Sequence, residues 1–65
     1  MFTTVVYKGQ DGETVTLAEG DGFLLIPNVG DSFLYGAGPF TVKARSFEYY
    51  DDQNGELAVT VTLTV

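Results

Sequence analysis

Cysteine and histidine are absent from the 65 residues of this chain. Without cysteine, neither a disulfide framework nor a thiolate metal site can form. Without histidine, acid–base catalysis at neutral pH is left to carboxylates alone. The commonest catalytic and metal-binding arrangements are thereby excluded, and we expect no enzymatic activity, no cofactor and no metal site. Ser32 and Ser46 have no histidine to activate them.

Long apolar runs are also missing. The longest, Phe23 to Pro27, is far too short to cross a bilayer, and the first ten residues lack the basic and apolar regions of a signal peptide. We therefore expect a cytoplasmic protein with no membrane partner. No window of twelve or more residues keeps the apolar spacing of three and four that a helix requires, which predicts that no long helix forms.

Basic residues are few. Three of them stand against nine acidic residues, for a net charge of −6. Lys43 and Arg45 lie near aromatic residues in the sequence, an arrangement that single-strand binders use. However, three cations cannot line a continuous basic groove, and a surface with this net charge repels phosphate backbones. We do not expect nucleic acid to be a direct ligand.

What the chain does contain is short stretches of Val, Thr, Phe, Tyr and Leu between clusters of Gly, Asp, Asn and Pro. This composition is typical of strands joined by tight turns. Turns are predicted at Asp11-Gly12, Glu19 to Gly22, Asn28 to Asp31 and Gly36 to Pro39. The predicted strands before the last turn are Phe2 to Tyr7, Thr14 to Ala18, Phe23 to Ile26 and Ser32 to Tyr35. Phe23 to Ile26 is apolar on both faces, which favours a central strand or one covered by a second layer of protein.

The end of the chain predicts a hairpin. Phe40 to Tyr50 and Leu57 to Val65 flank Asn54-Gly55, the strongest short hairpin signal. One face of the second strand is apolar over nine residues and is predicted to be buried: Leu57, Val59, Val61, Leu63 and Val65. In the first strand the apolar residues change parity after Ala44. A β-bulge near Arg45-Ser46, with the Arg45 side chain exposed, would restore the phase.

These features predict an all-β fold: a single five-stranded barrel over residues 1–65. We expect an SH3-like barrel, with an OB-like barrel as the alternative; OB barrels usually carry a helix between their third and fourth strands. The segment from Ile26 to Phe33 resembles the strand entry of many SH3-like barrels, in which Val-Gly-Asp precedes an apolar residue. Phe40 to Val65 resembles the closing hairpin of small uncharacterised barrels from phages and mobile elements. The resemblance covers about half of the chain and implies no catalytic or binding residue.

Nine aromatic residues are more than so small a barrel can enclose. Tyr49 and Tyr50 are adjacent, so they point to opposite faces of a strand, and at least one should be exposed or covered by another protein. Tyrosine is enriched at the centres of protein interfaces. The candidate interaction residues are Tyr35, Arg45, Phe47, Tyr49 and Tyr50. A tyrosine lying flat over the core with its hydroxyl in water is the alternative interpretation.

The preferred hypothesis is a non-catalytic protein-interaction module that self-associates or docks on a protein partner through an aromatic patch or a strand edge. A second hypothesis is an acidic inhibitor of a nucleic-acid-binding protein. Its phosphate mimics would be Asp11, Glu13, Glu19, Asp21, Asp51, Asp52 and Glu56.

A third hypothesis is a multimeric barrel that binds a small ligand, because one barrel of this size has no room for a cavity. Plasmid-borne type II dihydrofolate reductases are similar in size and class, but their Val-Gln-Ile-Tyr pore motif is missing here. Asp52, Asn54 and Glu56 alternate around Gly55 as in part of a calcium loop. The pattern has too few ligands for an EF-hand, and we interpret it as a hairpin turn.

Overall fold

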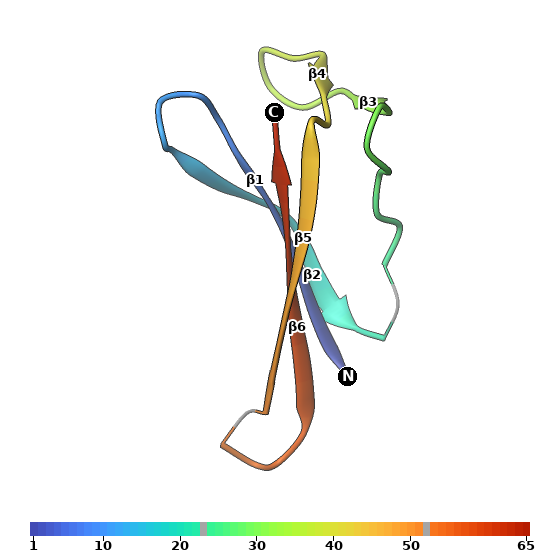
Figure 1. Ribbon diagram of the computed structural model, residues 1–65. Helices are drawn as coiled ribbons and strands as arrows, with labels where there is room; N and C mark the ends of the chain where they lie inside the picture. The colour runs from blue at the N-terminus through green and yellow to red at the C-terminus, as the bar shows by residue number, and fades with distance from the viewer. Residues whose placement is uncertain (23, 52) are drawn as a thin grey trace.

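The computed structural model describes residues 1–22, 24–51 and 53–65. Its elements are β1 (Phe2–Lys8), β2 (Thr14–Asp21), β3 (Ser32–Phe33), β4 (Phe40–Thr41), β5 (Ala44–Asp51) and β6 (Leu57–Thr64). Figure 1 shows a twisted four-stranded sheet in the order β2-β1-β6-β5, with a two-stranded ribbon of β3 and β4 at one end. The predicted all-β class is confirmed. None of the described residues forms a helix, so none forms a helix that could span a membrane.

The four-stranded sheet is mixed. β1 pairs with β2 in an antiparallel hairpin and with β6 in parallel, and β6 pairs antiparallel with β5. The predicted closing hairpin is confirmed from the Ala44–Thr64 pair to the Asp51–Leu57 pair. Gly55, in the turn between these strands, has a φ of +78°, a conformation that residues with a Cβ avoid.

The predicted bulge at Arg45-Ser46 is wrong, because the β5–β6 ladder is regular throughout. The change of phase occurs two residues earlier, where the chain leaves the β3–β4 ribbon. Val42 is buried there, and the amide of Lys43 donates to the carbonyl of Thr64. Breaking the strand at this point lets β4 and β5 belong to different sheets while both present apolar side chains to one core.

A bulge does occur in β2. Val5 pairs with Ala18 and Val6 with Thr16, so Leu17 is an extra residue in this strand. The strand then continues to Asp21, and the predicted turn at Glu19 to Gly22 is wrong over its first three residues. An extra residue shifts the side-chain alternation, because successive residues of a strand point to opposite faces.

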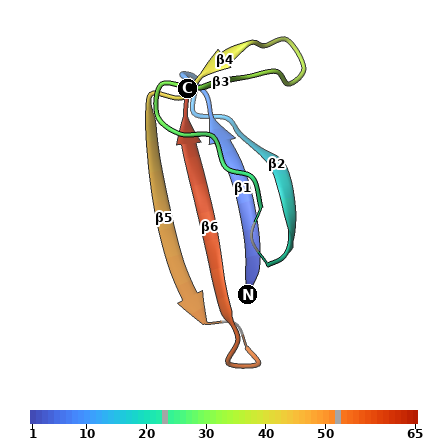
Figure 2. The ribbon, with the colours of Figure 1, turned by 90° about the vertical axis from the view of Figure 1, so that its right-hand side faces the viewer.

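The predicted third strand is also wrong over its described residues, 24–26; Phe23 lies outside the described residues. Residues 24–31, called the strap below, cross one face of the four-stranded sheet (Figures 1 and 2). Leu24 and Ile26 pack on the core, whereas Leu25 between them is 97% exposed. The segment thus covers a sheet instead of joining one. No ladder joins the two sheets among the described residues, so the predicted closure into a five-stranded barrel is not observed.

The core lies between the sheet and this covering segment. Alternate residues of β1 and β6 are buried on the covered face, together with one residue that follows β4: Thr3, Val5, Tyr7, Val59, Val61, Leu63 and Val42. Burying each large apolar side chain contributes about 1.5–3 kcal/mol. The alternation predicted for β6 is confirmed at its centre. Leu57, at the first position of the strand, is 46% exposed, so its predicted burial is wrong.

An aromatic cluster fills the end of the core beside the ribbon. The ring of Tyr7 lies 5.9 Å from Phe33, 6.0 Å from Tyr35 and 5.0 Å from Phe40, measured between centroids. Phe33 and Phe40 are directly paired in the β3–β4 ladder. The cluster therefore attaches the small ribbon to the four-stranded sheet through ring contacts.

Candidate interaction surface

The four-stranded sheet has two outer strands, β2 and β5. Both strands carry charged residues, but β2 also contains the bulge. A bulge is one of the features that protect an edge from pairing with another chain. β5 has eight residues in a regular ladder, and Figure 2 shows it at the margin of the sheet. β5 is therefore the less protected edge.

The hydrogen bonds at the end of β6 show which backbone groups of β5 face outward. The amide of Val65 donates to Lys8 in β1, and the carbonyl of Thr64 accepts from Lys43. Odd-numbered residues of β6 therefore turn to β1 and even-numbered residues turn to β5. Since opposed residues of an antiparallel pair face each other or away together, the odd-numbered residues of β5 direct their N–H and C=O groups to the free edge.

The same odd-numbered residues place an aromatic surface on the core side of the sheet. Arg45, Phe47 and Tyr49 form this surface, called the aromatic edge below. The rings of Phe47 and Tyr49 are stacked, with centroids 6.4 Å apart and planes 11° apart. The guanidinium carbon of Arg45 lies 5.3 Å from the centroid of Phe47, a cation–π contact. Phe47 is 45% exposed and Tyr49 is 63% exposed.

An apolar hollow of about 250 Å³ opens beside the aromatic edge. Its lining combines β5 with the strap, the buried faces of β1 and β6, and the first residue: Met1, Thr3, Leu24, Ile26, Phe47, Tyr49, Val59 and Val61. The strap thus leaves the sheet partly uncovered next to β5. The aromatic edge and the hollow form one continuous apolar surface.

Arg45 connects this surface to the strap. Its Nη1 donates to the carbonyl of Pro27 at 3.1 Å and to Oδ1 of Asn28 at 2.6 Å. The predicted exposure of Arg45 is wrong, since its side chain is only partly exposed. The reason is the earlier change of phase at Lys43, which turns Arg45 toward the covered face of the sheet.

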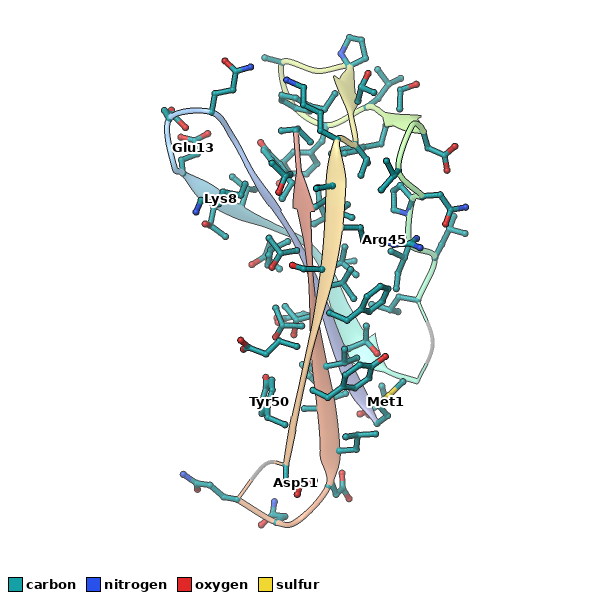
Figure 3. The ribbon with its side chains drawn as sticks, viewed as in Figure 1. Met1, Lys8, Glu13, Arg45, Tyr50 and Asp51 are labelled. Carbon is teal, nitrogen blue, oxygen red and sulfur yellow. The ribbon has the colours of Figure 1, made fainter. Side chains whose placement is uncertain are left out.

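The structure divides the five candidate interaction residues into three places. Arg45, Phe47 and Tyr49 lie together in the aromatic edge. Tyr35 belongs to the aromatic cluster at the ribbon end of the core. Tyr50 lies on the opposite face of the sheet, and Figure 3 shows it and Met1 on different sides of β5. The structure therefore brings three of the five candidates together, and sequence reasoning did not separate them from Tyr35 and Tyr50.

Tyr50 takes part in a second, smaller apolar group. It pairs across the sheet with Ala58, and Ala58 pairs with Phe2. Tyr50 and Phe2 are 46% and 40% exposed, whereas Ala58 between them is only 4% exposed. The two rings flank this small residue. A tyrosine lying over apolar neighbours with its hydroxyl toward water is the interpretation that fits Tyr50.

Cationic and acidic side chains are unevenly distributed along the strands of the sheet. All three cationic side chains lie toward one end: Lys8 pairs with Thr64, Lys43 bonds to Thr64, and Arg45 pairs with Leu63. Toward the other end, Glu19 and Glu48 share a row of the sheet, and Asp21 and Tyr50 share a row two residues further along. Asp11 and Glu13, in the β1–β2 turn, lie at the same end as the cations. Asp51 follows at the tip of β5 (Figure 3). β5 therefore begins beside two cations and ends with carboxylates.

The phosphate mimics of the inhibitor hypothesis do not gather on one side. Asp11 and Glu13 lie in the β1–β2 turn, where Oδ1 of Asp11 accepts a hydrogen bond from the Glu13 amide. Glu19, Asp21 and Asp51 lie at the opposite end of the sheet, and Asp52 is outside the described residues. The described members of the set thus belong to two separate regions.

Within the described residues, no three acidic side chains come together in a way that could hold a metal ion. The pattern that is like part of a calcium loop, interpreted above as a hairpin turn, falls partly on Asp52, outside those residues. The surface residues that sequence reasoning missed are Met1, Leu24 and Ile26. The sequence contained one signal for two of them: Leu24 and Ile26 are two residues apart in an uninterrupted apolar run, so they point to the same side of an extended chain.

No protein-family model, no curated protein and no solved structure matches this chain.

Proposed function

We propose that this chain is a non-catalytic protein-interaction module that associates with itself through the aromatic edge and the free backbone of β5. The observation that carries the proposal is the coincidence of two features on one strand. Phe47 and Tyr49 expose aromatic surface, and they direct backbone donors and acceptors to an edge on which no other described strand pairs. An exposed, regular and aromatic edge strand is a template for pairing with another chain.

The chemistry of the aromatic edge supports a protein partner. Aromatic residues and arginine are enriched at the centres of protein interfaces, where they fill pockets and exclude water. Here the stacked rings of Phe47 and Tyr49 border an apolar hollow that a partner side chain can enter. Contiguous apolar surface of this kind on a small protein marks an interaction site.

The charge pattern supports a second copy of the chain as that partner. Lys43 precedes β5 and Arg45 lies near its start, whereas Glu48 and Asp51 lie in its second half. When two identical strands pair antiparallel, the start of each lies beside the end of the other. Unlike charges are then opposed at both ends, which offsets part of the repulsion between two chains of net charge −6.

An SH3-like origin of the fold also remains a proposal. Its support is local: β3 begins at Ser32 directly after Val29-Gly30-Asp31, as the resemblance implies for a strand entry. The turn before β3 is closed by two hydrogen bonds, from the amide of Asp31 to the carbonyl of Asn28 and from the amide of Asn28 to Oδ2 of Asp31.

The test is sedimentation velocity of the purified chain over a wide concentration range. We expect a reversible dimer, and we expect Tyr49→Ser to raise its dissociation constant at least about tenfold, the typical effect of truncating an interface aromatic. Tyr50→Ser is the matched control, because it removes an equally large, exposed ring from the opposite face of the same strand. A monomer at every concentration, or equal weakening by both variants, would overturn the proposal.

A further inference from the structure

We infer that two copies pair β5 to β5 antiparallel about a two-fold axis at Phe47, forming one continuous eight-stranded sheet. This inference rests on the proposed function and specifies its geometry. In this arrangement Phe47 lies opposite the partner's Phe47, Arg45 lies opposite the partner's Tyr49, and Ser46 lies opposite the partner's Glu48. The two aromatic edges and their hollows then adjoin on one face of the joined sheet.

The backbone of β5 restricts the pairing. Its odd-numbered residues direct N–H and C=O groups outward, so they form the hydrogen-bonded pairs of the new ladder. Directly opposed residues must also lie on the same face of a continuous sheet. Pairing Arg45, Phe47 and Tyr49 with the same three residues of a second copy satisfies both conditions, because all three lie on one face and present free backbone groups.

The charges of β5 select among the registers that keep the faces aligned. Moving the axis to Glu48 would place that carboxylate directly opposite the partner's Glu48, and like charges in this position are destabilising. Moving it to Ser46 would shift the overlap toward Val42 and Lys43, which precede the first residue of β5. With the axis at Phe47, Glu48 meets the partner's Ser46, a neutral hydroxyl.

The side chains opposed by this register are complementary. Arg45 already lies over the ring of Phe47, and the partner's Tyr49 adds a second aromatic neighbour beside the guanidinium. Phe47 is 45% exposed in the single chain, and contact with the partner's Phe47 removes apolar surface from water at the centre of the interface. The partner's Lys43 comes near Asp51 at each end of the new ladder.

The register can be tested by disulfide trapping, because the natural chain contains no cysteine. Ser46 and Glu48 are exposed side chains on the uncovered face, so Ser46→Cys and Glu48→Cys leave the core unchanged. In the proposed register these positions oppose each other as a non-hydrogen-bonded pair. Its Cα separation of about 4.5 Å is within the range that a disulfide spans.

The two variants are mixed, one of them with a mass tag, and oxidised under mild conditions. We expect the mixed disulfide between Ser46→Cys and Glu48→Cys chains to exceed either homodimer roughly tenfold. In the proposed register a cysteine at either position lies two residues along the strand from the same position in the partner, which is too far for a disulfide. Thr16→Cys, exposed on the β2 edge, is the control and should give only collisional cross-links. Phe47→Cys should cross-link to itself.

Each of the other possible results contradicts a different part of the inference. Preferential self-cross-linking of Glu48→Cys or Ser46→Cys in a protein that sediments as a dimer overturns the register and leaves the self-association intact. Preferential cross-linking of Thr16→Cys overturns the choice of strand. A wild-type chain that stays monomeric in sedimentation overturns the self-association itself, and the register with it.

Discussion

Nη1 of Arg45 donates a hydrogen bond of 2.6 Å to Oδ1 of Asn28, joining β5 to the strap that covers the sheet. The same nitrogen also donates to the carbonyl of Pro27. The contact lies at one end of the aromatic edge, so the position of the strap and the shape of the interaction surface depend on the same side chain.

Arg45→Met tests this connection, because methionine keeps an unbranched apolar side chain but cannot donate a hydrogen bond. We expect the free energy of unfolding to fall by about 1–2 kcal/mol, since hydrogen bonds from charged groups contribute more than neutral ones. Hydrogen exchange should accelerate at the amides of Gly30 and Asp31 in the strap. Lys43→Met makes the same change of charge at an exposed position, and an equal loss there would contradict a specific role for Arg45.

Tyr49→Pro should block association while preserving the fold. The amide of Tyr49 faces the free edge, so proline removes no hydrogen bond of the single chain but prevents pairing. Tyr50→Pro, one residue away, removes an amide that bonds to β6 and should lower the free energy of unfolding by roughly 1–3 kcal/mol more. Urea unfolding and sedimentation separate the two effects. Equal destabilisation by the two variants would show that the assigned backbone directions are wrong.

Leu63→Ala should lower the free energy of unfolding by about 2–5 kcal/mol, since it leaves a cavity in a fully buried position. A domain of this length has roughly 3–10 kcal/mol in total, so the variant should be close to unfolded at room temperature. Leu25→Ala removes the same atoms from a side chain that is 97% exposed, and we expect almost no change. Thermal unfolding followed by circular dichroism measures both; a small effect of Leu63→Ala would place the core elsewhere.

Thr3→Val should destabilise the chain although the two side chains have almost the same shape. Thr3 is 2% exposed, and its hydroxyl donates to the carbonyl of Gly22 at 2.7 Å, connecting β1 to the end of β2. Without that donor the carbonyl loses its partner, at a cost of about 1–2 kcal/mol. Thr62→Val, on the uncovered face, serves as the control in urea unfolding. The hydrogen bond would be unimportant if both variants unfolded at the wild-type midpoint.

Gly55→Ala should weaken the β5–β6 hairpin. The φ of +78° at Gly55 costs a residue with a Cβ about 1–2 kcal/mol. Gly20→Ala is the control, because a methyl group there meets only Leu24 at an ordinary distance of 3.9 Å. We expect the melting temperature to fall for Gly55→Ala alone. An unchanged melting temperature would mean that the turn relaxes to a conformation that alanine accepts.

The sequence predicted the elements whose signals are local. The alternation in β6, the turns at Asp11-Gly12 and Gly36 to Pro39, and the closing hairpin all depend on neighbours within a few residues, and all are present. The candidate site was predicted in part for the same reason. Phe47 and Tyr49 share a parity in any strand, but Tyr35 and Tyr50 joined the same list only because they are aromatic.

Predictions that needed long-range information were wrong. An apolar run such as residues 24–26 can form a strand or lie across a sheet, and its own sequence does not decide between the two. The bulge was placed in β5 instead of β2, because a change of parity does not reveal where the chain bends between two sheets. The hollow depends on Met1, the strap and three strands together, and no local pattern predicts such a convergence.

By itself the sequence determined the all-β class, the strongest turns and the alternation that buries the centre of β6, because backbone conformation and side-chain parity are local properties. Only the tertiary structure decided that β1 and β6 pair in parallel, that the strap covers one face and that β5 is left as the open edge. Those arrangements follow from which apolar faces bury each other, and that choice is made between segments distant in the chain.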